Sequence, residues 1–218
     1  MRLFVVGDDF GYSIRRDQGI LHSLRLGLVQ NVCLLVNGVS ASSAARAFHD
    51  LQRDTMLQGG NIIEPPQLCL GLHLNLSEGI PICAPHLIPS LVHADNGTFL
   101  GKLGFVDACI GGKIAAEDVE REARAQYDKF VELVGHAPAF FNGHNHVHVF
   151  SPVLETVAKT FGECYGEKRH NRSVKSLLSN ANISQNNSCD GPGVPYVRMP
   201  IGKSEDGNSL WKLCMYDR

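Results

Sequence analysis

The sequence lacks any long hydrophobic run and any strong charge of one sign. No stretch of its 218 residues approaches the roughly 18 apolar residues of a membrane-spanning helix, and the N-terminal apolar run is too short for a signal peptide. The net charge of −2 and the pI of about 6.5 give no electrostatic reason to expect nucleic acid as a partner. We therefore expect a cytoplasmic protein that binds neither membranes nor nucleic acid.

Closely spaced cysteine pairs are also lacking. The seven cysteines are an odd number, are widely scattered and form no Cys-x-x-Cys motif, a pattern typical of reduced thiols. With 44% hydrophobic residues, a chain of this length can fill one core. We expect a single domain over residues 1–218.

Two adjacent carboxylates follow a short apolar stretch near the N-terminus. Residues 3–6 predict a strand buried on both faces, and Asp8 and Asp9 come directly after it. In parallel α/β folds the carboxyl ends of the strands carry the active site, so this pair is a candidate metal ligand plus general base. The alternative is that one aspartate caps the following helix and the other is solvated.

Strand and helix patterns alternate along the chain. A helix is predicted from Ser13 to about Gly27, and the further expected elements are a strand at 32–36, a helix at 40–51, a strand at 68–76 and a helix at 116–134. Such alternation favours a mainly parallel sheet with right-handed crossovers. Residues 52–66 predict a loop, and residues 77–113 predict a long excursion over the strand ends that could cover a substrate.

The strand at 68–76 carries two polar side chains near its end. His73 and Asn75 are two residues apart, so they lie on the same face of an extended chain. A histidine in such a strand could be a core residue bonded to a carbonyl group or a metal ligand. Its place at a strand end, like that of the aspartate pair, favours the ligand.

Three histidines at a spacing of two occupy residues 139–150. On an extended chain His144, His146 and His148 would project to one side, and a helix is predicted to begin near Pro152. Histidines that converge with carboxylates suit a divalent metal. The alternative is a polar strand edge whose histidines face water.

The last part of the chain shows little periodicity. Residues 166–192 are rich in Asn, Ser, Lys and Arg and predict a disordered insert, whereas residues 194–200 predict one more short strand. Four or five strands are too few to close an eight-stranded barrel.

Three of these stretches, in this order, resemble the YdjC family of carbohydrate deacetylases, which includes the chitooligosaccharide deacetylases. The matching motifs are Gly7-Asp8-Asp9-Phe10-Gly11, Gly71-Leu72-His73-Leu74-Asn75-Leu76 and Asn142-Gly143-His144-Asn145-His146-Val147-His148. The resemblance implies an α/β fold in the form of a deformed, incomplete TIM-type barrel. It also implies hydrolysis of the N-acetyl group of acetylated sugars with a bound divalent metal, commonly magnesium, although zinc or another divalent ion is open.

The resemblance also implies roles for four residues. Asp8 corresponds to the proton acceptor, and Asp9, His73 and His144 correspond to the metal ligands. A metal held by one carboxylate and two imidazoles keeps open positions for water and for the acetamide oxygen, which an amide hydrolase needs.

One step of the implied reaction has no assigned residue. After attack on the carbonyl, an acid must protonate the departing amine. His146 or His148 could supply that proton, and the sequence does not choose between them.

Two features depart from the family pattern. The family usually has aspartate at the position of Asn142, and its members generally continue well beyond residues 194–200, which predicts a missing C-terminal part. These departures favour one alternative to a deacetylase, a truncated, non-catalytic remnant that binds metal or sugar. A second alternative is a metal phosphohydrolase, since clusters of Asp and His also serve phosphoesters. Exposed sheet edges in an incomplete barrel also predict a homo-oligomer.

Overall fold

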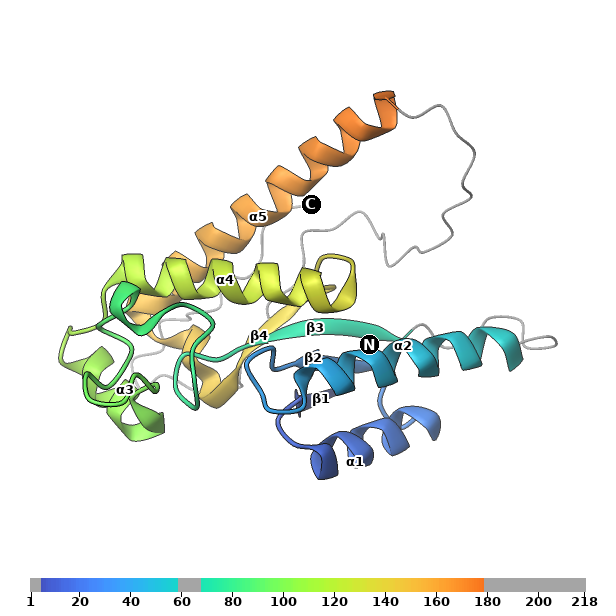
Figure 1. The fold of residues 1–218 in the computed structure, drawn as a ribbon, viewed down its shortest axis with the longest axis horizontal. Helices are drawn as coiled ribbons and strands as arrows, with labels where there is room; N and C mark the ends of the chain where they lie inside the picture. The colour runs from blue at the N-terminus through green and yellow to red at the C-terminus, as the bar shows by residue number, and fades with distance from the viewer. Residues whose placement is uncertain (1–4, 59–67, 179–218) are drawn as a thin grey trace, which may run out of the picture.

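The computed structural model describes residues 5–58 and 68–178, which form an α/β fold built on one sheet (Figure 1). All four strands are parallel and lie in the order β1-β2-β3-β4. Their bounds are Val6–Phe10 for β1, Asn31–Leu34 for β2, Cys69–Leu74 for β3 and Phe141–Gly143 for β4. The four carboxyl ends therefore meet at one edge of the sheet.

The four longer helices follow one another around the sheet. They are α1 (Ile14–Arg25), α2 (Ala41–Gln58), α4 (Ala116–Val134) and α5 (Ser151–Leu178). Contacts run from α1 to α2, from α2 to α4 and from α4 to α5, in the order in which Figure 1 shows them. The predicted alternation of strand and helix is confirmed. Within the described residues no helix combines the length and the apolar character needed to cross a bilayer.

Helix α4 matches its prediction at both ends. Val119, Ala123, Tyr127 and Phe130 are buried along one stripe, as the 3.6-residue period predicts. Gly135 ends the helix with a φ of 81°, a left-handed conformation that glycine adopts without a steric penalty.

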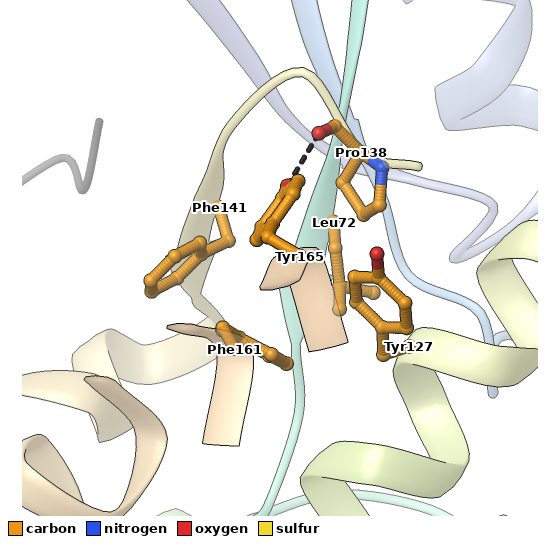
Figure 2. A pocket seen from close by; sticks show the side chains of 6 residues that line it. All are labelled: Leu72, Tyr127, Pro138, Phe141, Phe161 and Tyr165. Carbon is orange, nitrogen blue, oxygen red and sulfur yellow. Dashed lines mark hydrogen bonds between the residues drawn. The ribbon is translucent and has the colours of Figure 1, made fainter. Parts of the chain in front are cut away.

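Side chains from α4 and α5 close the core against the sheet. Figure 2 shows aromatic rings from both helices packed against β3 and β4, and the Tyr165 hydroxyl donates a hydrogen bond to the Pro138 carbonyl. The lining residues of this gap are Leu72, Tyr127, Pro138, Phe141, Phe161 and Tyr165. Because its walls are apolar or aromatic, the gap belongs to the core and offers no catalytic chemistry.

Several predicted bounds differ from the observed ones. Residues 3 and 4 of the first predicted strand and residues 59–66 of the predicted loop lie outside the described residues. Strand β1 starts at Val6 and includes both aspartates, and α2 continues to Gln58, so the predicted loop at 52–66 begins as helix. The segment at 77–113 is not all loop, because it holds the short η1 helix (Pro85–Leu87) and α3 (Gly101–Ile110). Leu103 and Ile110 of α3 are exposed while Phe105 is buried, so α3 has no one-sided apolar stripe to reveal it.

The C-terminal predictions divide at residue 178. Helix α5 runs through residues 166–178, which differs from the disordered insert predicted there, because a helical backbone does not need a periodic apolar stripe. Residues 179–192 and the strand predicted at 194–200 lie outside the described residues.

Gly71 gives a direct test of the packing that brings β3 to β4. A Cβ atom at this position would lie 2.7 Å from the Phe140 carbonyl oxygen and 2.8 Å from the Phe140 ring. We expect Gly71→Ala to lower the free energy of unfolding by about 1–3 kcal/mol, measured by urea denaturation. The matched control is Gly19→Ala in α1, where no atom lies within 4 Å and we expect a gain of about 1 kcal/mol. Equal effects of the two substitutions would contradict the described packing.

Candidate metal and catalytic site

The aspartate pair lies on an irregular part of β1. The register between β1 and β2 shifts between Gly7 and Phe10, and Asp9 has a φ of 63°, in the left-handed region that a non-glycine residue rarely adopts. The turn after the strand is held by a buried carboxylate, because Asp17 accepts the N–H of Gly11 at 2.7 Å. This kink lets the adjacent Asp8 and Asp9 side chains make different contacts.

Two of the predicted ligands, His73 and His144, approach one carboxylate oxygen of the third, Asp9. The Oδ1 atom of Asp9 lies 3.0 Å from Nε2 of His73 and 2.7 Å from Nδ1 of His144. The three residues come from β1, from β3 and from the residue directly after β4, so strand ends supply all of them. Their ligand atoms lie within 4.8 Å of one another.

The far nitrogen of each imidazole has its own hydrogen-bond acceptor. Nδ1 of His73 lies 2.6 Å from Oδ1 of Asn142, and Nε2 of His144 lies 3.1 Å from Oε2 of Glu78. Because the Asn142 amide nitrogen donates to Asp8 at 3.0 Å, its oxygen must face His73, which donates from Nδ1. This hydrogen-bond network leaves the Nε2 lone pair of His73 directed at Asp9.

The converging atoms fit a cation. Because its Nδ1 donates to Asn142, His73 directs its Nε2 lone pair at the Asp9 carboxylate, and His144 directs its Nδ1 lone pair there in the tautomer that donates a hydrogen bond from Nε2 to Glu78. Lone pairs facing an anionic oxygen repel one another unless a positive charge lies between them. One carboxylate and two imidazoles are a usual ligand set for a divalent metal, and the site fits such an ion.

A proton on His144 is the competing positive charge. Burial acts to lower the pKa of His144, but its hydrogen bonds to Asp9 and Glu78 outweigh burial and raise the pKa above its ordinary value. The same contact acts on the carboxylate, since the hydrogen bond from His144 is the largest of the effects that hold the pKa of Asp9 far below its usual range.

Arg16 engages the other oxygen of Asp9. Its Nη1 lies 2.7 Å from Asp9 Oδ2, and its guanidinium group lies 4.2 Å from the centre of the Tyr12 ring. Oδ1 is therefore the Asp9 oxygen that points toward the two imidazoles.

Asp8 makes a separate set of contacts. Its Oδ1 accepts the Asn142 amide and lies 3.2 Å from the Cys33 sulfur, which is also 3.3 Å from Nδ1 of His73. Asn142 thus bridges the predicted base to a predicted metal ligand.

The prediction of three histidines on one extended chain is wrong. Residues His144–Val149 form a tight η2 turn in which Asn145 and His146 have φ values of 51° and 57°. This left-handed backbone turns successive side chains in different directions. His144 and His148 are buried while His146 is exposed, and within the described residues only His144 of the three belongs to a cluster of possible metal ligands.

Sequence reasoning missed Glu78, Arg16 and Cys33. Glu78 lies in the segment predicted as a long excursion, Arg16 is an ordinary polar residue of α1, and Cys33 occupies an apolar strand. Among the residues that contact the ligands, the sequence singled out Asn142 alone, because the family usually has aspartate at that position.

Comparison with known proteins gives a family match over most of the chain. A family model described as YdjC-like protein matches residues 2–204, which is most of the chain. The chain belongs to the YdjC-like family. The YdjC-like chain is 40% identical over 163 residues to a carbohydrate deacetylase of Danio rerio, covering 75% of this chain and 47% of that protein.

Two further comparisons cover similar shares of the chain. A chitooligosaccharide deacetylase of Klebsiella pneumoniae (strain 342) is 34% identical over 156 residues, covering 72% of this chain and 54% of that protein. The crystal structure of an Enterococcus faecalis V583 protein assigned to cellobiose-phosphate cleavage aligns with a TM-score of 0.58 and 26% identity, covering 70% of this chain and 52% of that chain. The YdjC-like chain spans about half the length of the curated relatives it matches.

The structural match confirms the predicted fold class. The sheet is a curled, parallel half-barrel in an α/β fold, as the incomplete TIM-type barrel predicted. The predicted family is confirmed as well.

Competition between proton and metal at His144 predicts a pH dependence. Protonated His144 pairs with Asp9 and Glu78, which raises its pKa above the ordinary value of 6.5. This pairing stabilises the metal-free protein fully at pH values below 6.5, and the stabilisation is lost as pH rises through the raised pKa. Metal affinity should therefore rise with pH over the same window, with about one proton released per ion bound. Calorimetric titration with Mn²⁺ in buffers of different ionisation enthalpy measures that release. Binding that releases no proton and is independent of pH would contradict the assignment.

Proposed function

We propose that this protein is a metal-dependent hydrolase that removes N-acetyl groups from acetylated carbohydrates, as in oligosaccharide degradation. The convergence of Asp9, His73 and His144, with Asp8 bridged to His73 through Asn142, carries the proposal. The names of the relatives, carbohydrate deacetylase and chitooligosaccharide deacetylase, support the substrate class. The predicted partner is thus a small acetylated sugar.

Asp9, His73 and His144 would hold the metal ion. We propose Mg²⁺, the ion that the family resemblance implies, with Zn²⁺ or another divalent ion as the alternative that two imidazole ligands would suit. When bound there, the ion would polarise the acetamide carbonyl and lower the pKa of a water molecule.

Asp8 would act as the general base. Its Oδ1 accepts hydrogen bonds from the Asn142 amide and from the Cys33 thiol, which fix the orientation of the carboxylate. Asp8 would take a proton from the attacking water, whose oxygen bonds to the acetyl carbon. The acetyl C–N bond would then break as the nitrogen gains a proton, so that amide and water give acetate and a free amine. The candidates for the acid that protonates this nitrogen are His146 and His148.

Acetate release from short N-acetylglucosamine oligomers in the presence of Mg²⁺ tests the proposal. We expect Asp8→Asn to lower turnover by about 100-fold or more, because a general base contributes 10²–10⁴-fold, while metal affinity stays near that of the unmodified protein. Asp50→Asn is the matched control, since Asp50 is an exposed residue of α2 paired with Arg53.

The outcomes separate the competing functions. Equal turnover in the Asp8→Asn variant would overturn the role of Asp8. A folded, metal-loaded protein that releases no acetate from any acetylated sugar would overturn the proposal and favour a non-catalytic binding protein.

A further inference from the structure

The segment directly after β3 is tied to the end of that strand by Asn75. The Asn75 side-chain oxygen accepts the N–H groups of Ser77 and Glu78, each at 3.0 Å, and its amide nitrogen donates to the Glu78 carbonyl at 2.7 Å. Asn75 is 1% exposed, so these bonds are shielded from water. The backbone at Glu78 is therefore fixed relative to β3.

Asparagines that follow the neighbouring strands hold the same segment. Asn37, after β2, accepts from the Asn75 amide at 3.2 Å and donates to the Ile80 carbonyl at 3.0 Å. Asn145, after β4, donates to the Ser77 hydroxyl at 3.1 Å and to Oε1 of Glu78 at 3.0 Å. Three strand ends thus fix the segment, although in sequence it is only the start of a long connection.

Both oxygens of the Glu78 carboxylate are engaged. Oε1 accepts from Asn145, and Oε2 lies 3.1 Å from Nε2 of His144, whose Nδ1 faces Asp9 at 2.7 Å. The chain thus places a carboxylate on the far side of one candidate metal ligand and an amide, Asn142, on the far side of the other. A carboxylate that accepts the imidazole N–H fixes its tautomer and makes the opposite nitrogen a stronger donor to a metal.

We propose that Glu78 is a positioning residue that holds His144 with its Nδ1 lone pair directed at Asp9 and so sets the affinity of the site for a divalent cation. The proposal rests on the proposed metal site and deepens it. The far nitrogen of His73 faces a neutral amide, Asn142, whereas that of His144 faces the charged carboxylate of Glu78. This difference in charge is the main difference between the surroundings of the two imidazoles. Glu78 acts through His144 and needs no contact with the substrate.

Titration of the whole chain with Mn²⁺, followed by the electron paramagnetic resonance signal of the free ion, tests this role. We expect Glu78→Gln, which keeps the size of the side chain and removes its charge, to raise the Kd for Mn²⁺ by about 10- to 100-fold. At Mn²⁺ concentrations well above the raised Kd, the variant should bind as much metal as the unmodified protein. Glu120→Gln on α4 is the matched control, because Glu120 pairs with Arg124 of the same helix at 3.6 Å.

Unfolding of the metal-free proteins distinguishes positioning from a structural role. If Glu78 only held the loop, Glu78→Gln would lower the free energy of unfolding without metal and leave the Kd for Mn²⁺ unchanged, which would overturn the proposal. Should Glu78→Gln fail to fold, Glu78→Asp keeps the charge but shortens the reach to His144, and the same rise in Kd is expected.

The test separates this inference from the proposed function. If the unmodified protein releases acetate while Glu78→Gln binds Mn²⁺ with unchanged Kd, only the role of Glu78 fails. If the unmodified protein binds no Mn²⁺, the metal site and the role of Glu78 fail together. A raised Kd in a protein without deacetylase activity would support Glu78 and overturn the proposed reaction.

Discussion

The contact of two imidazole nitrogens with a single oxygen of Asp9 is the constraint on which the rest of the site depends. At 2.7 Å and 3.0 Å both nitrogens lie within hydrogen-bond distance of this oxygen, and a proton or a metal ion between a nitrogen and the carboxylate makes each contact favourable. This convergence requires a left-handed backbone at Asp9, which costs about 1–3 kcal/mol. The hydrogen bond from Gly11 to Asp17 and the pairing of the strand in the sheet hold the turn in this conformation.

Strand register explains how the site is assembled. His73 of β3 pairs directly with Asn142 of β4, so the two side chains lie on the same face and Asn142 reaches Nδ1 of His73. The same asparagine reaches Asp8 on β1. An aspartate at this position would accept from His73 but could not donate to Asp8, so the Asn142 amide makes a link that the usual family residue cannot make.

The sequence predicted the parts of the molecule that depend on periodicity and on strand ends. Helix α4 was predicted with its observed bounds because its apolar stripe is regular. Strand ends made the aspartate pair, His73 and the three histidines candidates, and the family resemblance singled out Asp8, Asp9, His73 and His144. The left-handed turn at Asn145 and His146 was not predictable from spacing, since two consecutive non-glycine residues with positive φ are held by tertiary contacts. Glu78 was missed for a similar reason. Its position depends on hydrogen bonds from residues that follow three different strands.

The central claim is that Asp9, His73 and His144 form one metal site. A crystal of the protein soaked in Mn²⁺, with anomalous diffraction data, tests it most directly. We expect an anomalous peak bounded by Oδ1 of Asp9, Nε2 of His73 and Nδ1 of His144. A peak elsewhere, or none at Mn²⁺ concentrations that saturate other divalent sites, would contradict it.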